Sequence, residues 1–100
     1  MDVKGSVAVI TGGASGIGET VARYLAAQGA AVVLGDMNQE GLDRVVADIR
    51  KAGGKAAGRT LNVTDDADTA SFMDFAVKEF GAINIAVPCA GIIRDAMFLS

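Results

Sequence analysis

A short glycine-rich segment carries the clearest chemical signal in this sequence. It reads Thr11-Gly12-Gly13-Ala14-Ser15-Gly16-Ile17-Gly18 and stands between an apolar run and a stretch with helical periodicity. The N-terminus of a helix offers unpaired N–H groups and the positive end of the helix dipole, and both attract a diphosphate. Side chains would hold the phosphates away from those donors, so glycine suits this place. The segment therefore predicts a phosphate-binding turn.

Each position in this turn has an expected part in holding a diphosphate. We expect Gly12 to permit the sharp exit from the strand and Gly16 to let the backbone approach the phosphates. Gly18 is expected to let the helix sit close to the sheet. Ser15 adds a hydroxyl donor beside the turn, and Ile17 supplies a further contact of the helix N-terminus with the diphosphate.

Asp36 is the second residue with a predicted ligand. It ends a second apolar run, eighteen positions after Gly18, where a carboxylate accepts hydrogen bonds from the hydroxyls of an adenosine ribose. The same carboxylate repels a 2′-phosphate, and neither Met37 nor any residue from Thr11 to Thr20 is a Lys or Arg that would pair with one. The sequence therefore favours NAD over NADP, with Met37 beside Asp36 at the ribose.

Both features also have an ordinary structural interpretation. Glycine-rich turns occur in many loops, and an acid at the end of a strand is often only a turn residue. Found together, with a strand before, a helix after and the separation of a dinucleotide site, they favour cofactor binding. A P-loop is excluded because no Gly-Lys-Ser/Thr follows, and a methyltransferase-type adenosine site would carry an acid where Thr11 stands.

Short apolar runs alternate with segments of helical periodicity along the chain. Parallel strands need crossover connections, and right-handed crossovers place helices on both faces of the sheet. The alternation predicts an α/β fold, a Rossmann-type doubly wound parallel sheet in three α/β/α layers, of which this chain holds the first four strands. The expected strands are 6–11, 31–36, 56–63 (the weakest) and 83–87, and the expected helices are 16–28, 38–53 and 64–81.

The last expected helix begins with several acids. Thr64 is expected to cap it, with Asp65, Asp66 and Asp68 in the first turn, where the helix dipole favours negative charge. A calcium site is the weaker alternative, because the glycine and distal glutamate of an EF-hand loop are missing. Apolar residues at helical spacing predict a face buried in the core or in a subunit interface: Phe72, Met73, Phe75, Ala76 and Phe80.

The composition excludes several classes of function. Hydrophobic residues make up 51% of the 100 residues, which excludes intrinsic disorder. The net charge is −3 and no basic block occurs, which argues against a general nucleic-acid binder. The sequence has no His, which removes the commonest metal ligand, and one Cys, which excludes an internal disulfide. No apolar run of membrane-spanning length and no signal peptide occur, so we expect a cytoplasmic protein without a metal site or a membrane partner.

Two residues with reactive side chains are assigned to packing. Tyr24 lies inside the first expected helix, where we expect it to pack against its neighbours. Cys89 has no His to activate it as a nucleophile, so a small buried apolar role is favoured.

The glycine-rich turn resembles that of the short-chain dehydrogenase/reductase family, which opens with T-G-x-x-x-G-I-G. The matching residues are Thr11, Gly12, Gly16, Ile17 and Gly18, and the similarity extends over the whole chain. Asp36 falls where NAD-preferring members of the family keep their acid.

Two later segments resemble the family's pattern with changes. Asn62 replaces the first Asp of a D-V-T-D stretch that approaches adenine, so the resemblance places Asn62 and Val63 beside the base. The segment Val87-Pro88-Cys89-Ala90-Gly91-Ile92 is similar to N-N-A-G-I, with Pro88 and Cys89 in place of the two Asn. Pro has no N–H and no side-chain amide, so it cannot make the hydrogen bonds that the family's Asn pair makes in the sheet and near the cofactor. The resemblance still implies cofactor contact through the backbone of Cys89, Ala90 and Gly91.

The resemblance implies an NAD-dependent oxidoreductase that moves a hydride between a secondary alcohol or ketone and nicotinamide, working as a homo-oligomer. The family's catalytic Ser, Tyr and Lys cannot be placed in residues 1–100, since the residue four positions after Tyr24 is Gln28. We therefore expect residues 1–100 to be a dinucleotide-binding domain cut before its catalytic part. A binding module or scaffold without catalysis is the alternative, and a doubly wound domain that binds no nucleotide is a weaker one.

Overall fold

The computed structural model describes residues 3–89 as three helices that alternate with four strands. Most of the bounds expected from the sequence agree with the structure to within a few residues. The elements are β1 (Val7–Thr11), α1 (Gly16–Ala27), β2 (Ala31–Asp36), α2 (Gln39–Lys51), β3 (Lys55–Thr60), α3 (Asp66–Phe80) and β4 (Ile85–Pro88).

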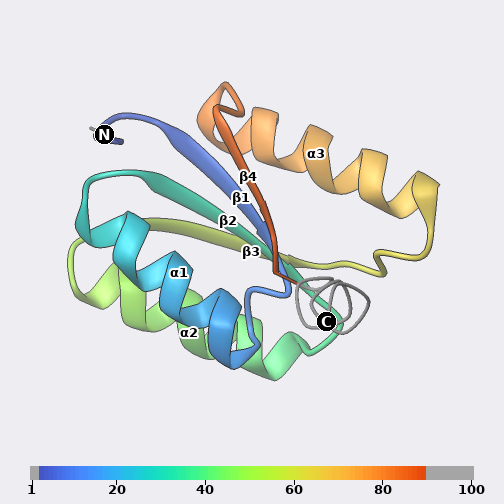
Figure 1. Cartoon of the computed structure of the whole chain (residues 1–100), viewed down its shortest axis with the longest axis horizontal. Coiled ribbons are helices and arrows are strands. Elements are labelled where there is room, and N and C mark those ends of the chain that lie inside the picture. The colour runs from blue at the N-terminus through green and yellow to red at the C-terminus, as the bar shows by residue number, and fades with distance from the viewer. Residues whose placement is uncertain (1–2, 90–100) are drawn as a thin grey trace, which may run out of the picture.

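The four strands form one parallel sheet in the order β3-β2-β1-β4. Helices α1 and α2 lie on one face of the sheet and α3 lies on the other (Figure 1). The chain winds outward from β1 in one direction and then returns to its other side at β4, so the strand order reverses beside β1. This arrangement confirms the predicted doubly wound α/β fold.

The strands are apolar on both sides because both faces of the sheet are covered. Successive side chains of a strand point to opposite faces. On one face Ile10 and Leu34 pack with Leu42 of α2. On the other face Val9 and Val33 pack with Phe72 of α3, and all of these side chains are fully buried.

Strand β4 begins two residues later than the sequence predicts and ends one residue later. At its start Asn84 continues the pairing with β1, because its N–H donates to Val7 O at 2.9 Å and its Oδ1 accepts from Val7 N at 2.8 Å. At its end Pro88 pairs with Thr11. Proline has no N–H to donate to a neighbouring strand, and within residues 3–89 the only strand that β4 pairs with is β1.

Helix α3 is capped by Asp65, and the expectation that Thr64 caps it is wrong. The Asp65 carboxylate accepts from Ala67 N at 3.0 Å and from Asp68 N at 3.2 Å. The Thr64 hydroxyl instead donates to Asn62 Oδ1 at 2.6 Å. A carboxylate is the better partner for the positive end of the helix dipole, so the cap falls one residue later.

The structure places Tyr24, which is expected to pack along its helix, at the protein surface. Tyr24 is 63% exposed on α1, whereas Ala22 on the same helix is fully buried. With about 3.6 residues per turn, Tyr24 lies two positions after Ala22 and therefore on the opposite side of α1, whereas Leu25 packs against the core. None of the helices within residues 3–89 is long and apolar enough to cross a membrane.

Candidate functional site

The predicted site residues within the described chain come together at the carboxyl edge of the sheet. The parallel register aligns Thr11 with Gly35 and Pro88, and Asp36 with Thr60. The glycine-rich turn follows β1, Met37 follows β2, and Asn62 and Val63 follow β3. This edge, at the point where the strand order reverses, is where ligands bind in open α/β sheets. The predicted contacts of Ala90 and Gly91 lie outside the described residues.

The turn after β1 is held against β2 by its own backbone. Gly12 has a φ of 74°, a conformation that favours glycine. The N–H groups of Gly12 and Gly13 both donate to Gly35 O, at 2.7 and 3.1 Å. A Cβ at Gly13 would lie 2.8 Å from Leu34 Cβ, so this glycine is also required. The requirement for glycine at position 13 comes from Leu34 on β2, so the sequence around Gly13 does not reveal it.

Ser15 is the N-cap of α1. Its Oγ accepts from Gly18 N at 3.1 Å and donates to Gly12 O at 2.6 Å, so the hydroxyl closes the turn on both sides. Its hydrogen is thus directed at Gly12 in this structure, and a bond from Ser15 to a phosphate stays a prediction.

Gly16 and Gly18 differ in the space around them. A Cβ at Gly18 would lie 1.9 Å from Gly12 O, so packing within the protein demands glycine there. A Cβ at Gly16 would meet no atom of the described chain within 4 Å. Gly16 and Ile17 are the first two residues of α1, and their N–H groups have no acceptor within their own helix. The turn therefore has an open side at which a ligand can approach the backbone.

Asp36 connects the turn to the next helix. Its Oδ2 accepts from Ala14 N at 3.1 Å and its Oδ1 accepts from Asn38 N at 2.9 Å. Each carboxylate oxygen has two lone pairs, so both keep one for a ligand. Asp36 can thus accept from ribose hydroxyls while holding the turn.

The acid nearest the start of α1 is neutralised by two arginines. Glu19 lies in the first turn, and its carboxylate pairs with Arg44 and Arg23, each at 2.8 Å. Hydrogen bonds from Arg44 and Arg23 lower the pKa of Glu19 from 4.5 to about 2. The two positive charges offset a negative charge that would otherwise repel an anion near this helix N-terminus.

A small open cavity lies next to Asp36 at the end of β3. Its volume is about 190 Å³, and Met37 and Asn62 are among the residues that line it. Three apolar side chains at this edge of the sheet are unusually exposed, namely Ile17 at 41%, Met37 at 74% and Val63 at 49%. All three are predicted from the sequence to contact the cofactor, and in the structure each side chain is exposed enough to contact a ligand.

Cys89 follows β4 and is buried. It packs in the same core cluster as Ile10 and Leu34, and burial raises the pKa of its thiol. A buried thiol with a raised pKa is a poor nucleophile, which agrees with the packing role expected for its side chain. The predicted contact of its backbone with a cofactor stays a prediction.

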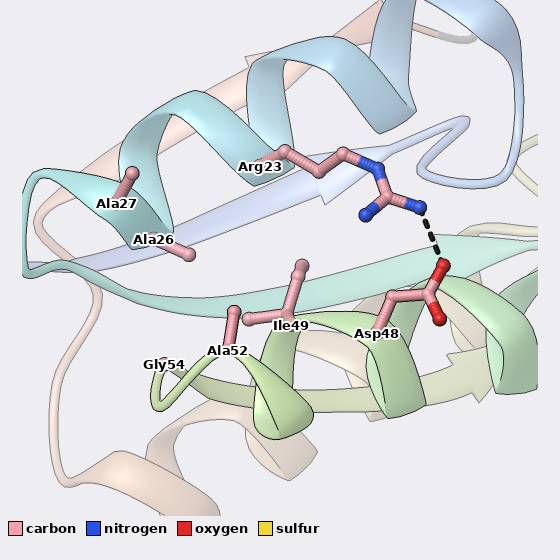
Figure 2. Close-up of a pocket in the computed structure, with 7 residues that line it drawn as sticks. All are labelled: Arg23, Ala26, Ala27, Asp48, Ile49, Ala52 and Gly54. Atoms are coloured by element: carbon pink, nitrogen blue, oxygen red, sulfur yellow. Dashed lines mark hydrogen bonds and ion pairs between the residues drawn. The ribbon is translucent and has the colours of Figure 1, made fainter.

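Another cavity, of about 340 Å³, lies between α1 and α2 (Figure 2). Ala26 and Ile49 line it, and the ion pair between Arg23 and Asp48 closes one side at 2.8 Å. Gly54, which also lines it, directly precedes β3. This cavity therefore lies toward the amino ends of the strands, away from the glycine-rich turn.

Known proteins with this sequence pattern share the same fold. The family model described as short chain dehydrogenase matches residues 6–100. A 2,5-dichloro-2,5-cyclohexadiene-1,4-diol dehydrogenase of Sphingobium indicum is 47% identical over 96 residues, which cover 96% of this chain and 38% of that protein. A cis-4-hydroxycyclohexanecarboxylate dehydrogenase of Sinomonas cyclohexanicum is 50% identical over 86 residues, which cover 86% of this chain and 34% of that protein.

A solved structure extends the comparison to the fold. A short-chain dehydrogenase/reductase from Burkholderia phymatum, crystallised in complex with NAD, superposes with a TM-score of 0.84 at 34% identity. The match covers 86% of this chain and 31% of that one. The chain thus spans about a third of the length of the relatives it matches. From the turn sequence, the parallel sheet and these matches together, the chain belongs to the short-chain dehydrogenase family.

Proposed function

We propose that this chain forms the NAD site of an oxidoreductase that transfers a hydride between a secondary alcohol or ketone and nicotinamide. The diphosphate lies at the open side of the turn, against the Gly16 and Ile17 amides. The ribose hydroxyls donate to Asp36. Bound NAD supplies the hydride acceptor, and the residues of this chain bind and orient it.

The observation that carries this proposal is the open space at Gly16. A Cβ there meets nothing within 4 Å, so packing within the described chain does not explain a glycine at this position. A ligand that approaches the backbone closely does explain it. The amides at the start of α1 and the neutralised charge of Glu19 give that ligand the character of an anion.

Preference for NAD over NADP is supported by the end of β2. Asp36 keeps acceptor capacity for hydroxyl groups but repels a phosphate, and the exposed Met37 that follows offers no positive charge. Support for NAD also comes from the NAD complex of the Burkholderia relative.

A cyclic secondary alcohol is the favoured substrate class. The names of both reported relatives describe a hydroxyl group on a six-membered carbon ring. No catalytic acid or base is assigned to this chain, because its single tyrosine is exposed on α1 and is followed four residues later by Gln28. The alternative function, a module that binds the dinucleotide without catalysis, is supported by Pro88 and Cys89, which stand in place of the family's two Asn.

The decisive experiment measures binding and turnover on the purified protein. We expect isothermal titration calorimetry to give a higher affinity for NAD than for NADP. We expect Gly16→Ala to lower the affinity for NAD at least tenfold while the protein stays folded. The new methyl group would occupy the space through which the diphosphate reaches the backbone N–H groups at the start of α1. Normal NAD binding by the Gly16→Ala variant would contradict the proposed site.

Turnover separates the two functions. An NAD-dependent dehydrogenase will produce the absorbance of reduced nicotinamide with cyclohexanol or a related cyclic alcohol. Binding of NAD without turnover across a panel of cyclic and open-chain secondary alcohols would support the binding module instead.

A further inference from the structure

Helix α2 begins in close contact with the glycine-rich turn. Gly41 lies in the first turn of α2 and is buried. A Cβ at this position would lie 2.8 Å from Ala14 Cβ in the turn and 2.7 Å from Asn38 Nδ2. Glycine lowers the stability of a helix relative to alanine. The close approach of α2 to the turn therefore explains why a residue without a side chain stands here.

The two residues that a Cβ at Gly41 would meet are also the two that donate to the Asp36 carboxylate. Ala14 N donates to Oδ2 at 3.1 Å, and Asn38 N donates to Oδ1 at 2.9 Å. The Asn38 side chain is also the N-cap of α2, because its own Oδ1 accepts from Gly41 N at 3.0 Å. A methyl group at position 41 would thus press on both of the residues that orient Asp36.

Helix α2 is held in place by contacts on its other sides. Leu42 and Val45 are fully buried in the core. Arg44 pairs with Glu19 of α1 at 2.8 Å. Because protein interiors are closely packed, moving this helix costs more than moving a turn. We therefore expect the turn, and Ala14 within it, to shift when position 41 gains a methyl group.

A shift of Ala14 reaches the amides that are proposed to bind the diphosphate. Ser15, the N-cap of α1, directly follows Ala14, and Gly16 is the next residue. The covalent chain holds consecutive Cα atoms about 3.8 Å apart. A movement of Ala14 therefore changes the position of the start of α1 relative to Asp36.

We propose that Gly41 is a positioning residue of the cofactor site. It acts through Ala14 and Asn38, because its missing side chain lets α2 hold both residues where they fix the Asp36 carboxylate and the start of α1. This inference rests on the proposed function. It adds a residue of α2, outside the glycine-rich turn and the ribose acid, to those that determine the affinity for the cofactor.

Gly41→Ala tests the proposal in two measurements on the purified protein. We expect calorimetric titration to give an affinity for NAD about tenfold below that of the wild-type protein, because hydrogen bonds to a charged group depend on where the donors lie. We also expect the Ala14 N–H to exchange with solvent about tenfold faster, followed by NMR, because its bond to Asp36 is weakened. The exchange measurement needs no ligand.

Gly54→Ala is the matched control. Gly54 follows the other end of α2, and Figure 2 shows it there with Ile49. A Cβ at Gly54 would lie 2.8 Å from Ile49 Cγ2, so the same methyl group strains the packing of the same helix at the end opposite the turn. We expect urea unfolding to show a loss of stability in this variant, while the affinity for NAD and the exchange of the Ala14 N–H stay as in the wild-type protein.

A double variant, Ala14→Gly with Gly41→Ala, moves the methyl group across the contact. It also serves if Gly41→Ala alone does not fold. The Ala14 methyl is bonded directly to the backbone, whereas Asn38 Nδ2 is at the end of a side chain, so the double variant removes the more rigid of the two overlaps. We expect it to fold and to recover most of the affinity for NAD.

Several results would overturn the assignment while leaving the proposed function intact. Wild-type affinity for NAD and wild-type exchange of the Ala14 N–H in a folded Gly41→Ala variant would show that Gly41 serves packing alone. Equal losses of affinity in Gly41→Ala and Gly54→Ala would show a general loosening of α2. A double variant that recovers neither folding nor affinity would overturn the contact with Ala14. If the wild-type protein bound no NAD, the proposed function would fall, and the exchange of the Ala14 N–H would still decide whether Gly41 positions the turn.

Discussion

The Asp36 carboxylate accepts a hydrogen bond from the backbone N–H of Ala14 at 3.1 Å. The bond joins the end of β2 to the turn after β1, and the second carboxylate oxygen of Asp36 reaches Asn38 N at 2.9 Å, at the start of α2. One side chain therefore fixes two loops at the carboxyl edge of the sheet. The residue predicted to select the cofactor also holds the turn that is predicted to bind its phosphates.

Replacing Asp36 with Ala should lower the affinity for NAD at least tenfold, because the ribose hydroxyls lose their acceptor. It should also reduce the discrimination against NADP, because the repulsion of a 2′-phosphate is removed. The affinity for NADP should still not reach the wild-type affinity for NAD, since the Ala14 and Asn38 amides lose their acceptor. Calorimetric titration with both cofactors checks this. The NAD affinity of Asp36→Asn, which keeps one acceptor oxygen, should fall between that of the wild-type protein and that of Asp36→Ala. Unchanged affinities of Asp36→Ala for both cofactors would refute the ribose assignment.

Gly18→Ala and Gly16→Ala should affect stability differently although both add one methyl group to α1. A Cβ at Gly18 would overlap Gly12 O at 1.9 Å, so we expect a loss of about 1–3 kcal/mol in the free energy of unfolding. A Cβ at Gly16 has nothing within 4 Å, and Ala should leave stability unchanged or raise it by up to about 1 kcal/mol. Urea unfolding measures both. An equal loss of unfolding free energy in Gly18→Ala and Gly16→Ala would contradict the conclusion that only Gly18 is required by packing.

Acid should weaken the contact between α1 and α2. The pKa of Glu19 in the folded protein is about 2, below its ordinary value of 4.5, because Arg44 and Arg23 hydrogen bond to the carboxylate. The folded state thus binds fewer protons, and the stabilisation is fully present above pH 4.5 and lost as the pH falls toward 2.

Glu19→Gln should therefore be less stable than the wild-type protein at pH 7, by up to about 1 kcal/mol for partly exposed ion pairs. The difference should shrink as the pH falls from 4.5 toward 2, where about half of the wild-type carboxylate is protonated. Thermal unfolding of both proteins across this range checks the prediction. A difference that stayed constant with pH would point to packing instead of charge.

Asp65→Ala should destabilise α3 more than Thr64→Ala does. Loss of an N-cap carboxylate costs about 1 kcal/mol, and Asp65 accepts from two amides of the first turn. The Thr64 hydroxyl contacts Asn62 and not the helix. Chemical denaturation of the two variants gives the comparison, and the reverse order would restore the cap expected from the sequence.

Some parts of the site followed from the sequence because they depend on neighbours along the chain. The positive φ of Gly12, the helix start at Gly16 and the strand end at Asp36 are set by local backbone requirements and by the alternation of apolar runs with helical periodicity. The same alternation fixed the doubly wound topology, because parallel strands need crossover helices.

Other parts depended on residues distant in the chain and could be decided only by the tertiary structure. Gly13 is required by Leu34, and the carboxylate of Asp36 is directed at Ala14, since β1 and β2 are adjacent in the sheet. The exposure of Tyr24 and the full burial of Ala22 depend on which side of α1 faces the sheet. Periodicity places a side chain on a helix, but burial and hydrogen-bond partners depend on which other elements pack against it.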